Sequence, residues 1–396
     1  MDRPRQKEQR SATRTGFTTG ANACAAAAAA TCLLTGRALG AWAEALPDYT
    51  ADRYDVLAGA VIVRIPNGDV VRFPVRIARL EAPGTAYASV IKDAGDDPDC
   101  THRAEIWARV TLDDSGEITL LRGEGVGVVT RPGLGIPVGE PSITTPPREN
   151  IRAEVMPLLP EGSGAQVTIG IVDGERLSEK TLNARLGIVG GLSILGTTGI
   201  VRPYSTAAFR ASVVQAIDVA REQGLDEVVL TTGGRSERFA MGVLSELPEQ
   251  AFVQMGDFIG AALTRAAARG HRRATISGMM GKLSKMAAGT RMTHAKGSKV
   301  DMGLLAGLAE QVGAPDALRE AILAANTGRH VQELVTVAGL GPAFFAALCE
   351  RASVMQAAHL QGRFESPPAV HVLMFDFGGE LLARHDPPRG PEEPHP

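Results

Sequence analysis

The chain has 396 residues, with 41 Lys and Arg against 44 Asp and Glu. The net charge of −3 gives no electrostatic footprint for nucleic acid or an anionic membrane, and 4% aromatic residues leave few platforms for stacking bases. The length predicts two or three domains with a large core.

The N-terminal segment has features of both a secretion signal and a buried helix. Basic residues precede the apolar run Ala23 to Leu34, and Ala41-Trp42-Ala43 has the form of a cleavage site. The run is mostly alanine, however, and it follows the loop-like sequence TGFTTG. We therefore expect residues 1–13 to be a flexible tail and the run to be a buried helix with Thr18 or Thr19 as its N-cap. Such a capped helix of small residues needs no ligand.

Two hairpins are predicted next. The apolar stretches of residues 60–77 flank Asn67-Gly68, the strongest short hairpin signal. The stretches EIWARVTL and EITLLRG flank Asp113-Asp114-Ser115-Gly116 in a similar way. With the Ala-rich helix packed on these strands, residues 14–185 are predicted to form an α+β domain with a mainly antiparallel sheet.

An acidic turn, Lys92 to Asp99 (KDAGDDPD), lies between the predicted hairpins. Four aspartates so close together repel one another unless a cation, a donor network or a proton separates them. One of them is therefore a candidate base or orienting group. The alternative, which spacing alone favours, is an exposed turn with Asp as an ordinary turn residue. His102 and His294, read in isolation, are more typical of structural than of catalytic residues.

The stretch Arg122 to Arg148 contains too many glycines and prolines for regular structure. Its interleaved aliphatic residues argue against disorder, so we predict a shaped loop that encloses a ligand. A proline-rich crossover between domains is the alternative. A helix from Pro146 to Leu159 and a strand from Ala165 to Val172 are predicted beyond it.

From Leu186 onward the pattern changes to strand, glycine loop and helix, repeated three times. The predicted strands end at Leu195, Leu230 and Ile276. This alternation predicts a Rossmann-like parallel α/β domain over residues 186–384, with all three loops at the sheet edge where ligands bind. None of the loops has the GxGxxG or GxxxxGK[ST] fingerprint. Each loop, taken alone, could equally be a tight turn without a ligand.

The rest of this domain is predicted to be helical over residues 300–361 and to end in a strand near Phe377, with residues 385–396 as a flexible tail. Basic residues accompany the second and third loops, namely Arg235, Arg238, Lys282, Lys285 and Arg291. Individually they are typical solvated charges. As a group at one edge they indicate a ligand with several carboxylates.

The four cysteines are widely spaced without a CxxC pair, and the eight histidines form no HExxH or HxH arrangement. This pattern predicts a reducing compartment, the cytoplasm, and no metal held by the protein.

Six segments, in this order, resemble one family closely: TGFTTGANACAAAAAA, VIKDAGDDPDCTH, GEGVGVVTRPGLGIPVGEP, RLGIVGGLSILGTTGIVRPYS, VVLTTGGRSE and GMMGKLSKMAAG. The family is cobalt-precorrin-5B C1-methyltransferase (CbiD), of the anaerobic cobalamin pathway. The resemblance implies methyl transfer from S-adenosyl-L-methionine to ring carbon C1, giving cobalt-precorrin-6A, with cobalt present only inside the substrate. Arg103 is a departure, because the resemblance leads us to expect a small residue after the Thr-His pair.

The family name itself assigns no catalytic residue, so the expected roles come from the residues themselves together with the implied reaction. Candidates for proton transfer are Asp93, Asp96, Asp97 and His102. The expected cofactor-binding residues are Gly125, Gly127, Gly133, Gly135, Gly196, Thr197, Thr198, Gly233 and Gly234. The expected contacts to substrate carboxylates are Lys92, Arg131, Arg235, Lys282 and Lys285. The corrinoid macrocycle is expected to lie between the two domains.

Two other classes of function stay open at this point. A nucleotide-dependent oxidoreductase would use the same loops, although the dinucleotide fingerprint is absent. A noncatalytic carrier would bind the corrinoid precursor without transferring a methyl group. The sequence leaves the oligomeric state open, a homo-oligomer included.

Overall fold

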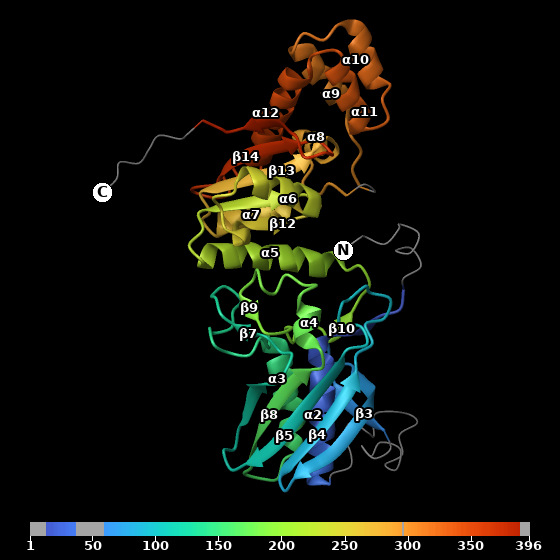
Figure 1. Cartoon of the computed structure of the whole chain (residues 1–396), viewed down its shortest axis with the longest axis vertical. Coiled ribbons are helices and arrows are strands. Elements are labelled where there is room, and N and C mark those ends of the chain that lie inside the picture. Colours follow the sequence, from blue (N-terminus) through green and yellow to red (C-terminus); the bar gives the residue numbers. More distant parts are fainter. Residues whose placement is uncertain (1–12, 37–58, 295–296, 389–396) are drawn as a thin grey trace, which may run out of the picture. The chain divides into compact units, whose positions relative to one another are not determined.

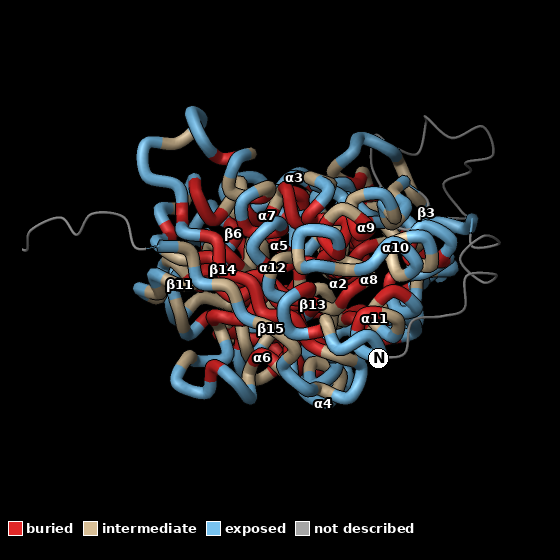
Figure 2. The backbone as a smooth tube through the Cα atoms, turned by 90° about the horizontal axis from the view of Figure 1, so that it is seen from above, coloured by how far each residue is buried: buried red, intermediate tan, exposed pale blue. Residues whose placement is uncertain are grey.

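The computed structural model describes residues 13–36, 59–294 and 297–388. The chain forms two compact units, Met1–Thr206 and Ala207–Pro396 (Figure 1). Each unit has its own hydrophobic core, and the buried segments are red in Figure 2.

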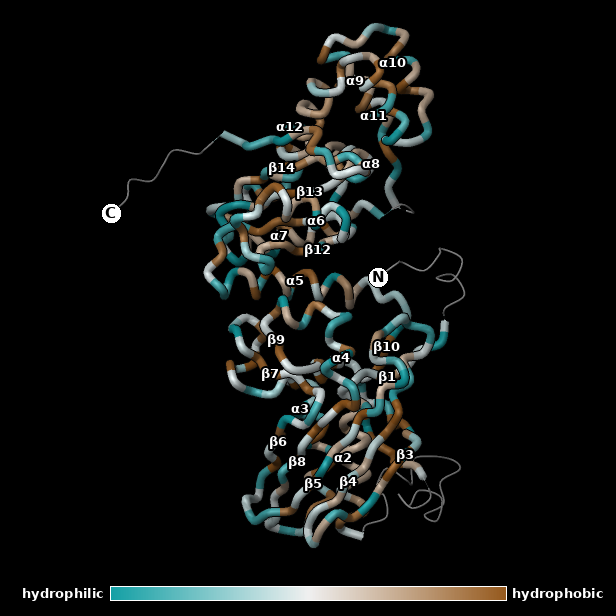
Figure 3. Tube along the Cα trace, in the orientation of Figure 1, coloured by the Kyte–Doolittle hydropathy of each residue, from teal (hydrophilic) through white to brown (hydrophobic). Residues whose placement is uncertain are grey.

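The first unit is built on a six-stranded, mainly antiparallel sheet with the strand order β2-β3-β4-β5-β8-β6. Hydrophobic and hydrophilic residues are interspersed along β3 (Figure 3), where Phe73 is buried in the core and Leu80 is 62% exposed. The strands are β2 (Ala60–Arg64), β3 (Val70–Ala82), β4 (Thr85–Ile91), β5 (Glu105–Asp113), β6 (Ile118–Arg122) and β8 (Gly164–Ile171).

Helix α2 (Thr19–Thr35) packs on this sheet. Its side chains from Ala23 to Ala30 are each at most 1% exposed. Because alanine carries only a methyl group, the helix backbone lies close to the strands and leaves no room for larger residues. Helix α3 (Thr145–Val155) packs beside α2 and ends in a 3₁₀ turn, Met156–Leu158.

Two small antiparallel sheets join segments of the first unit that lie far apart in the sequence. Strand β1 (Gly16–Phe17) pairs with β10 (Ile200–Val201), and β7 (Val128–Val129) pairs with β9 (Ile188–Val189). The short helix α4 (Gly174–Ser178) lies between β8 and β9 in the sequence. The first and last segments of this unit are therefore neighbours in space.

The second unit has a five-stranded sheet with the order β12-β11-β13-β14-β15. All neighbouring strands are parallel except the pair β14 and β15. The strands are β11 (Glu227–Thr231), β12 (Phe252–Gln254), β13 (Arg273–Met279), β14 (Ala369–Phe375) and β15 (Leu381–His385).

Helices cover both faces of this sheet, because alternate strand residues belong to different core clusters. Val228 and Leu230 pack with residues of α5 (Thr206–Glu222), α7 (Ile259–Ala268), α8 (Met280–Ala287) and α12 (Gly341–Ala358). Val229 packs with Ala240 of α6 (Gly234–Val243), near the 3₁₀ turn Glu249–Ala251. The remaining helices are α9 (Met302–Gln311), α10 (Asp316–Leu323) and α11 (Gly328–Val337).

The predicted fold classes are confirmed: a mostly antiparallel α+β unit comes first, and a mostly parallel α/β unit follows. The hairpin at Asn67-Gly68 forms between β2 and β3. The second predicted hairpin is wrong, because β8 lies between β5 and β6 and pairs with both. Local sequence cannot reveal such an insertion, since β8 begins at Gly164, far along the chain.

The first of the three predicted parallel strands is also wrong. Leu192 and Ile194 form isolated bridges to Val126 and Ile143 in the first unit and are not part of the second unit's sheet. An apolar run between glycines has the same sequence pattern in a sheet strand as in a buried extended segment, so the pattern does not distinguish the two. The two units accordingly divide after Thr206, whereas the sequence places the boundary after residue 185.

At the ends of the chain, residues 1–12 and 389–396 of the predicted tails lie outside the described residues, as does the cleavage-like Ala41-Trp42-Ala43. Strand β15 ends at His385, where the C-terminal tail is predicted to begin. Among the described residues no helix has the length and apolar character needed to span a bilayer.

Candidate functional site

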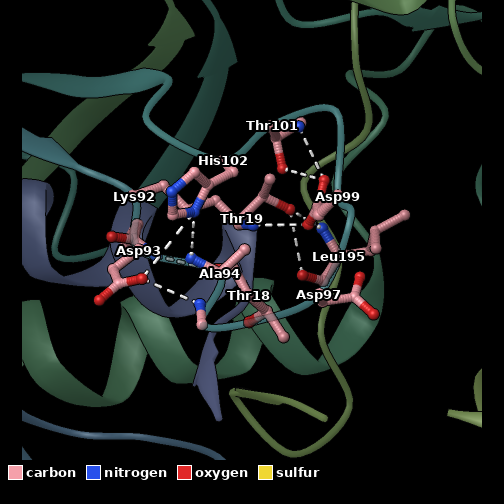
Figure 4. A network of polar contacts seen from close by, with 12 residues as sticks. Thr18, Thr19, Lys92, Asp93, Ala94, Asp97, Asp99, Thr101, His102 and Leu195 are labelled. Carbon is pink, nitrogen blue, oxygen red and sulfur yellow. Dashed lines mark hydrogen bonds and ion pairs between the residues drawn. The ribbon is translucent and has the colours of Figure 1, made fainter. Parts of the chain in front are cut away.

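The acidic turn is the loop that joins β4 to β5. Lys92 N donates to Ala104 O at 2.9 Å and Arg103 N donates to Lys92 O at 2.8 Å, which closes the base of the loop. Phe17 N donates to Asp93 O at 2.8 Å, so β1 also binds this loop. Figure 4 shows the turn with its hydrogen bonds and ion pairs.

Asp93 and Asp96 hold the chain that leads into β1. Asp96 Oδ2 accepts from the backbone N–H groups of Thr13 at 3.0 Å and Arg14 at 2.8 Å. The Arg14 guanidinium forms an ion pair with Asp93, and this hydrogen bond holds the pKa of Asp93 below its usual value. Both carboxylates are therefore engaged by the protein, and Asp93 is a weak proton acceptor.

Burial raises the pKa of Asp97, whereas the pKa of Asp93 is lowered. Its Oδ1 accepts from Tyr204 N at 2.9 Å. Tyr204 has a φ of 52°, a left-handed conformation that is uncommon for a residue with a Cβ. Strained backbone of this kind persists only where surrounding contacts hold it, and the bond to Asp97 is one such contact.

Lys92 and Asp99 form a buried ion pair. The Lys92 side chain is 1% exposed, and its Nζ donates to Asp99 Oδ2 at 2.6 Å. Asp99 Oδ1 accepts from both the backbone N–H and the hydroxyl of Thr101, at 2.7 and 2.6 Å. Lys92 thus compensates the charge of Asp99 inside the turn.

His102 contacts the same turn through its ring. Its Nδ1 accepts from Ala94 N at 3.1 Å, so the neutral ring carries its proton on Nε2. The following residue, Arg103, has a φ of 63°. This conformation favours glycine, which is a physical reason for a small residue at this position.

The N-terminus of α2 lies beside the segment 193–199. Thr18 caps the helix, with Ala21 N donating to its Oγ1 at 3.2 Å. Thr19 Oγ1 donates to Leu195 O at 3.1 Å and accepts from Leu195 N at 2.9 Å (Figure 4). A Cβ on Gly196 would lie 2.1 Å from Thr18 Oγ1. The helix end is therefore closed by the protein's own groups, and Gly196 is required for this packing.

Thr197 and Thr198, which follow Gly196, are exposed. Thr198 O accepts from Asn67 N at 3.2 Å, which joins this loop to the β2–β3 turn. The loop at Gly196 thus belongs wholly to the first unit, while the loop at Gly233 belongs to the second.

The glycine–proline loop has a packed part and an open part. A Cβ on Gly125 would lie 2.0 Å from Ile171 O, and one on Gly127 would lie 2.4 Å from Ile188 Cγ2. Gly135, with a φ of 69°, would meet nothing within 4 Å. Gly133 also has a positive φ, 110°, and the half-buried Arg131 side chain lies close to Gly187.

In the second unit, the connection from β11 leads to β12 on one side, and the next connection crosses to β13 on the other. The space between the ends of β11 and β13 is therefore a topological switch point, where ligands bind in open α/β sheets. Thr232 N donates to Ser277 O at 3.1 Å across this point. A Cβ on Gly233 would meet nothing within 4 Å, and one on Gly234 would meet only the Gln254 amide, at 3.6 Å or more.

Lys282 and Lys285 of α8 already have partners in the protein. Lys282 forms an ion pair with Asp257, and Lys285 Nζ donates to Thr293 O at 3.1 Å. Burial raises the pKa of Asp257, but the hydrogen bonds from Lys282 and Thr293 outweigh burial, so the pKa is lowered. Burial also lowers the pKa of Lys285.

Arg235 has a different environment at the start of α6. Its guanidinium carbon lies 5.8 Å from the centre of the Phe377 ring, and that of Arg329 lies 5.5 Å from the same ring. Phe377 is 49% exposed. No sequence pattern indicated the contact between Arg329 and Phe377, or the contacts that Arg14 and Tyr204 make to the acidic turn. Within the described residues, no group of three or more His, Cys, Asp or Glu could hold a metal ion.

Two parts of this chain match known sequence families. The sequence pattern of the CbiD family matches residues 6–203, and that of the CbiD C-terminal domain matches residues 292–386. The chain belongs to the CbiD family. The first CbiD match contains the whole acidic turn and the glycine–proline loop and ends close to the division between the two units.

Relatives of this CbiD chain are similar along almost their whole length. Cobalt-precorrin-5B C(1)-methyltransferase of Polaromonas sp. JS666 is 48% identical over 96% of this chain and 99% of that protein. The protein with the same description from Leptospira interrogans (strain Fiocruz L1-130) is 44% identical over 93% of this chain and 95% of that protein. A crystal structure of the cobalamin biosynthesis protein cbiD from Archaeoglobus fulgidus is 28% identical, covers 70% of this chain and 81% of that chain, and has a TM-score of 0.35. The family resemblance seen in the sequence is confirmed.

Proposed function

We propose that this chain methylates cobalt-precorrin-5B at ring carbon C1 to give cobalt-precorrin-6A, with S-adenosyl-L-methionine as the methyl donor. The observation that carries the proposal is the 48% identity across nearly the whole of a relative described as cobalt-precorrin-5B C(1)-methyltransferase. Cobalt enters as part of the substrate.

The methyl donor fits best at the switch point of the second unit. Gly233 and Gly234 have open space where a Cβ would stand, so a ligand could approach the backbone there. By contrast, Gly125, Gly127 and Gly196 pack against protein atoms. We therefore assign the donor to Gly233 and Gly234, while Gly135, which also has open space around it, stays a prediction.

When bound, S-adenosyl-L-methionine supplies a methyl group on a positively charged sulfur, so the reaction needs alignment more than a protein nucleophile. Correct positioning alone is worth about 7–11 kcal/mol of a barrier. Rigid backbone serves this purpose, and Thr232 is fixed by its bond to Ser277 O and a 3.1 Å contact with Ser236 Oγ.

Among the four candidates for proton transfer, we assign the role to Asp97. Asp93 and Asp96 are engaged with Arg14, and His102 Nδ1 is occupied by Ala94 N. Burial raises the pKa of Asp97, which brings it closer to the range of a useful acid or base. His102 keeps its Nε2–H as a donor for a substrate oxygen.

The activity is tested by incubating the chain with cobalt-precorrin-5B and methyl-labelled S-adenosyl-L-methionine, followed by mass spectrometry of the macrocycle. We expect one labelled methyl group on the product. Macrocycle that stays bound but unlabelled would instead identify a carrier.

The donor site is tested by calorimetric titration of S-adenosyl-L-methionine into Gly234→Val and Gly242→Val. Both glycines belong to α6 and have room for a side chain, but only Gly234 stands at the switch point. We expect binding to be lost in Gly234→Val and kept in Gly242→Val. Equal affinity of both variants would contradict the assignment.

Asp97→Asn tests the proton-transfer role. We expect turnover to fall about 100-fold or more while the affinity for the methyl donor is unchanged. Asp113→Asn is the matched control, because Asp113 also sits at a turn, where it accepts from Ser115 N at 3.0 Å. Full turnover by Asp97→Asn would remove this residue from the mechanism.

A further inference from the structure

Three segments of the second unit place two guanidinium groups against one exposed aromatic ring. Arg235 stands in the first turn of α6, Arg329 in the first turn of α11, and Phe377 in the turn between β14 and β15. The two guanidinium carbons lie 5.8 and 5.5 Å from the ring centre. All three segments meet at the carboxyl edge of the parallel strands.

The turn that carries Phe377 is held in place by its own backbone. Asp376 Oδ1 accepts from Gly379 N at 2.6 Å and from Glu380 N at 2.8 Å. A Cβ on Gly379, which has a φ of 104°, would lie 2.6 Å from the Phe239 ring. The ring of Phe377 is therefore presented from a fixed turn, although it is 49% exposed.

Arg329 is fixed in a similar way. The preceding Gly328 packs closely on α8, because a Cβ added to it would lie 3.2 Å from Gly281 Cα. Thr327 caps α11 by accepting from His330 N at 3.2 Å. The start of α11 therefore abuts the start of α8, which follows β13 directly, next to the switch point.

The positive charges in this cluster are only partly compensated. Arg329 Nε forms an ion pair with Glu333 at 3.0 Å. The carboxylate of Asp376 accepts hydrogen bonds from backbone amides of its own turn. Among the described residues, Arg235 makes no ion pair. Two like charges that converge on one ring repel each other, and an anion between them would relieve that repulsion. Guanidinium groups match carboxylates in a two-point geometry.

We infer that Arg235, Arg329 and Phe377 form a receptor for carboxylate side chains of the corrinoid macrocycle, with the Phe377 ring contacting its apolar surface. This inference rests on the proposed function, because that function supplies a flat substrate with many carboxylates. The methyl donor also has a carboxylate, but only one, and it carries its own ammonium group beside it. Two separate guanidinium groups and an aromatic ring match the macrocycle better.

The test uses cobyrinic acid, a corrinoid with free carboxylates, and its heptamethyl ester, in which they are masked. Each is titrated calorimetrically into the full chain, without methyl donor, and into Arg235→Gln, Arg329→Gln, Phe377→Leu and the control Arg351→Gln. Arg351 is an exposed arginine of α12. Thermal unfolding by circular dichroism checks that every variant is folded.

We expect each Arg→Gln change to weaken cobyrinic acid binding about tenfold or more, as for a lost hydrogen bond to a charged group. Binding of the ester should be unaffected by these changes, Phe377→Leu should weaken both ligands, and Arg351→Gln should change neither. Unchanged affinity for the acid in both arginine variants would overturn the inference. So would an equal loss for acid and ester.

Two further measurements separate this inference from the proposed function and from the other carboxylate source. If the variants lose cobyrinic acid while the native chain transfers no methyl group, the receptor stands and the methyltransferase proposal fails. If the native chain is active and the arginine variants keep its KM, the receptor fails and the activity stands. A loss of S-adenosyl-L-methionine affinity with cobyrinic acid binding intact would assign the carboxylate to the donor and overturn the inference.

Discussion

Lys92 is a charged side chain with 1% of its surface exposed, at the end of strand β4. A buried charge is tolerated only when it is paired, and Asp99 supplies the pairing at 2.6 Å. The same carboxylate also bonds Thr101, so one ion pair fixes both halves of the acidic turn.

Replacing Lys92 with Met should therefore destabilise the protein strongly. We expect a loss of about 3–5 kcal/mol in the free energy of unfolding, as when one partner of a buried pair is removed. Urea unfolding followed by tryptophan fluorescence measures this loss. The double variant Lys92→Met, Asp99→Asn should recover much of the stability, because no uncompensated charge is left. An equal loss in both variants would contradict the explanation.

The same pair predicts a pH dependence. Burial raises the pKa of Asp99, but attraction to Lys92 and the hydrogen bonds from Lys92 and Thr101 outweigh burial, so the pKa is lowered. The stabilisation is therefore fully present above the ordinary aspartate pKa of about 3.9 and is lost as the pH falls through the folded-state pKa.

Urea unfolding at a series of pH values below about 5 checks this sign. In Asp99→Asn the free energy of unfolding should fall less steeply with acid than in the native chain. Asp114→Asn, at an exposed turn position, serves as the control and should keep the native slope. A native slope in both variants would remove Asp99 from the acid response.

A substitution at Arg103 is expected to raise the free energy of unfolding, whereas the substitution at Lys92 lowers it. Its φ of 63° costs a residue with a Cβ about 1 kcal/mol, which glycine avoids. Arg103→Gly should therefore raise the free energy of unfolding, whereas Arg103→Ala should not, since alanine keeps the unfavourable conformation. Urea unfolding distinguishes the two, and a gain for alanine equal to that for glycine would point to the side chain rather than the backbone.

Among the elements, α2 depends most on residue size. Ala26 is fully buried where the helix packs on the sheet. Ala26→Leu should lower the free energy of unfolding by about 1–3 kcal/mol through overpacking, while the volume-conserving Leu34→Met should cost less than about 1.5 kcal/mol. Thermal and urea unfolding test the contrast. A neutral Ala26→Leu would mean that the helix can move away from the sheet.

The elements that sequence predicts correctly are those fixed by local chemistry. Asn67-Gly68 sets the β2–β3 turn, and Thr18 caps α2 with its own hydroxyl. The elements that it misplaces depend on distant partners. Strand β8 separates β5 from β6, and the apolar segment at Leu192 joins the first unit.

The candidate site likewise combines residues that the sequence indicates with partners that it does not indicate. The acidic turn is visible as a run of aspartates, and Gly233-Gly234 as a glycine pair after an apolar strand. Their partners are not visible, because Tyr204 meets Asp97 and Phe377 meets Arg235 across long stretches of sequence. Periodicity and turn chemistry report near neighbours only, so such pairings need the fold.

For the whole molecule, the two separate cores predict two unfolding events. The two tryptophans are both in the span of the first unit: Trp107 lies in β5, and Trp42 is outside the described residues. Fluorescence therefore reports the first unit, while far-ultraviolet circular dichroism reports both.

In Lys92→Met, we expect the fluorescence transition to move to lower urea while part of the circular dichroism signal keeps its native midpoint. Comparing the two signals in one titration provides the test. Coincident transitions in the variant would show that the units unfold as one.

The pairing of β1 with β10 has a consequence during protein synthesis. Gly16 faces Val201, so β1 acquires its partner only after the chain has been translated as far as β10. Until then Asp97 has no Tyr204 to bind, and the acidic turn is incomplete. Contacts between such distant residues form late. The acidic turn of the nascent chain is therefore completed only when the last stretch of the first unit has left the ribosome.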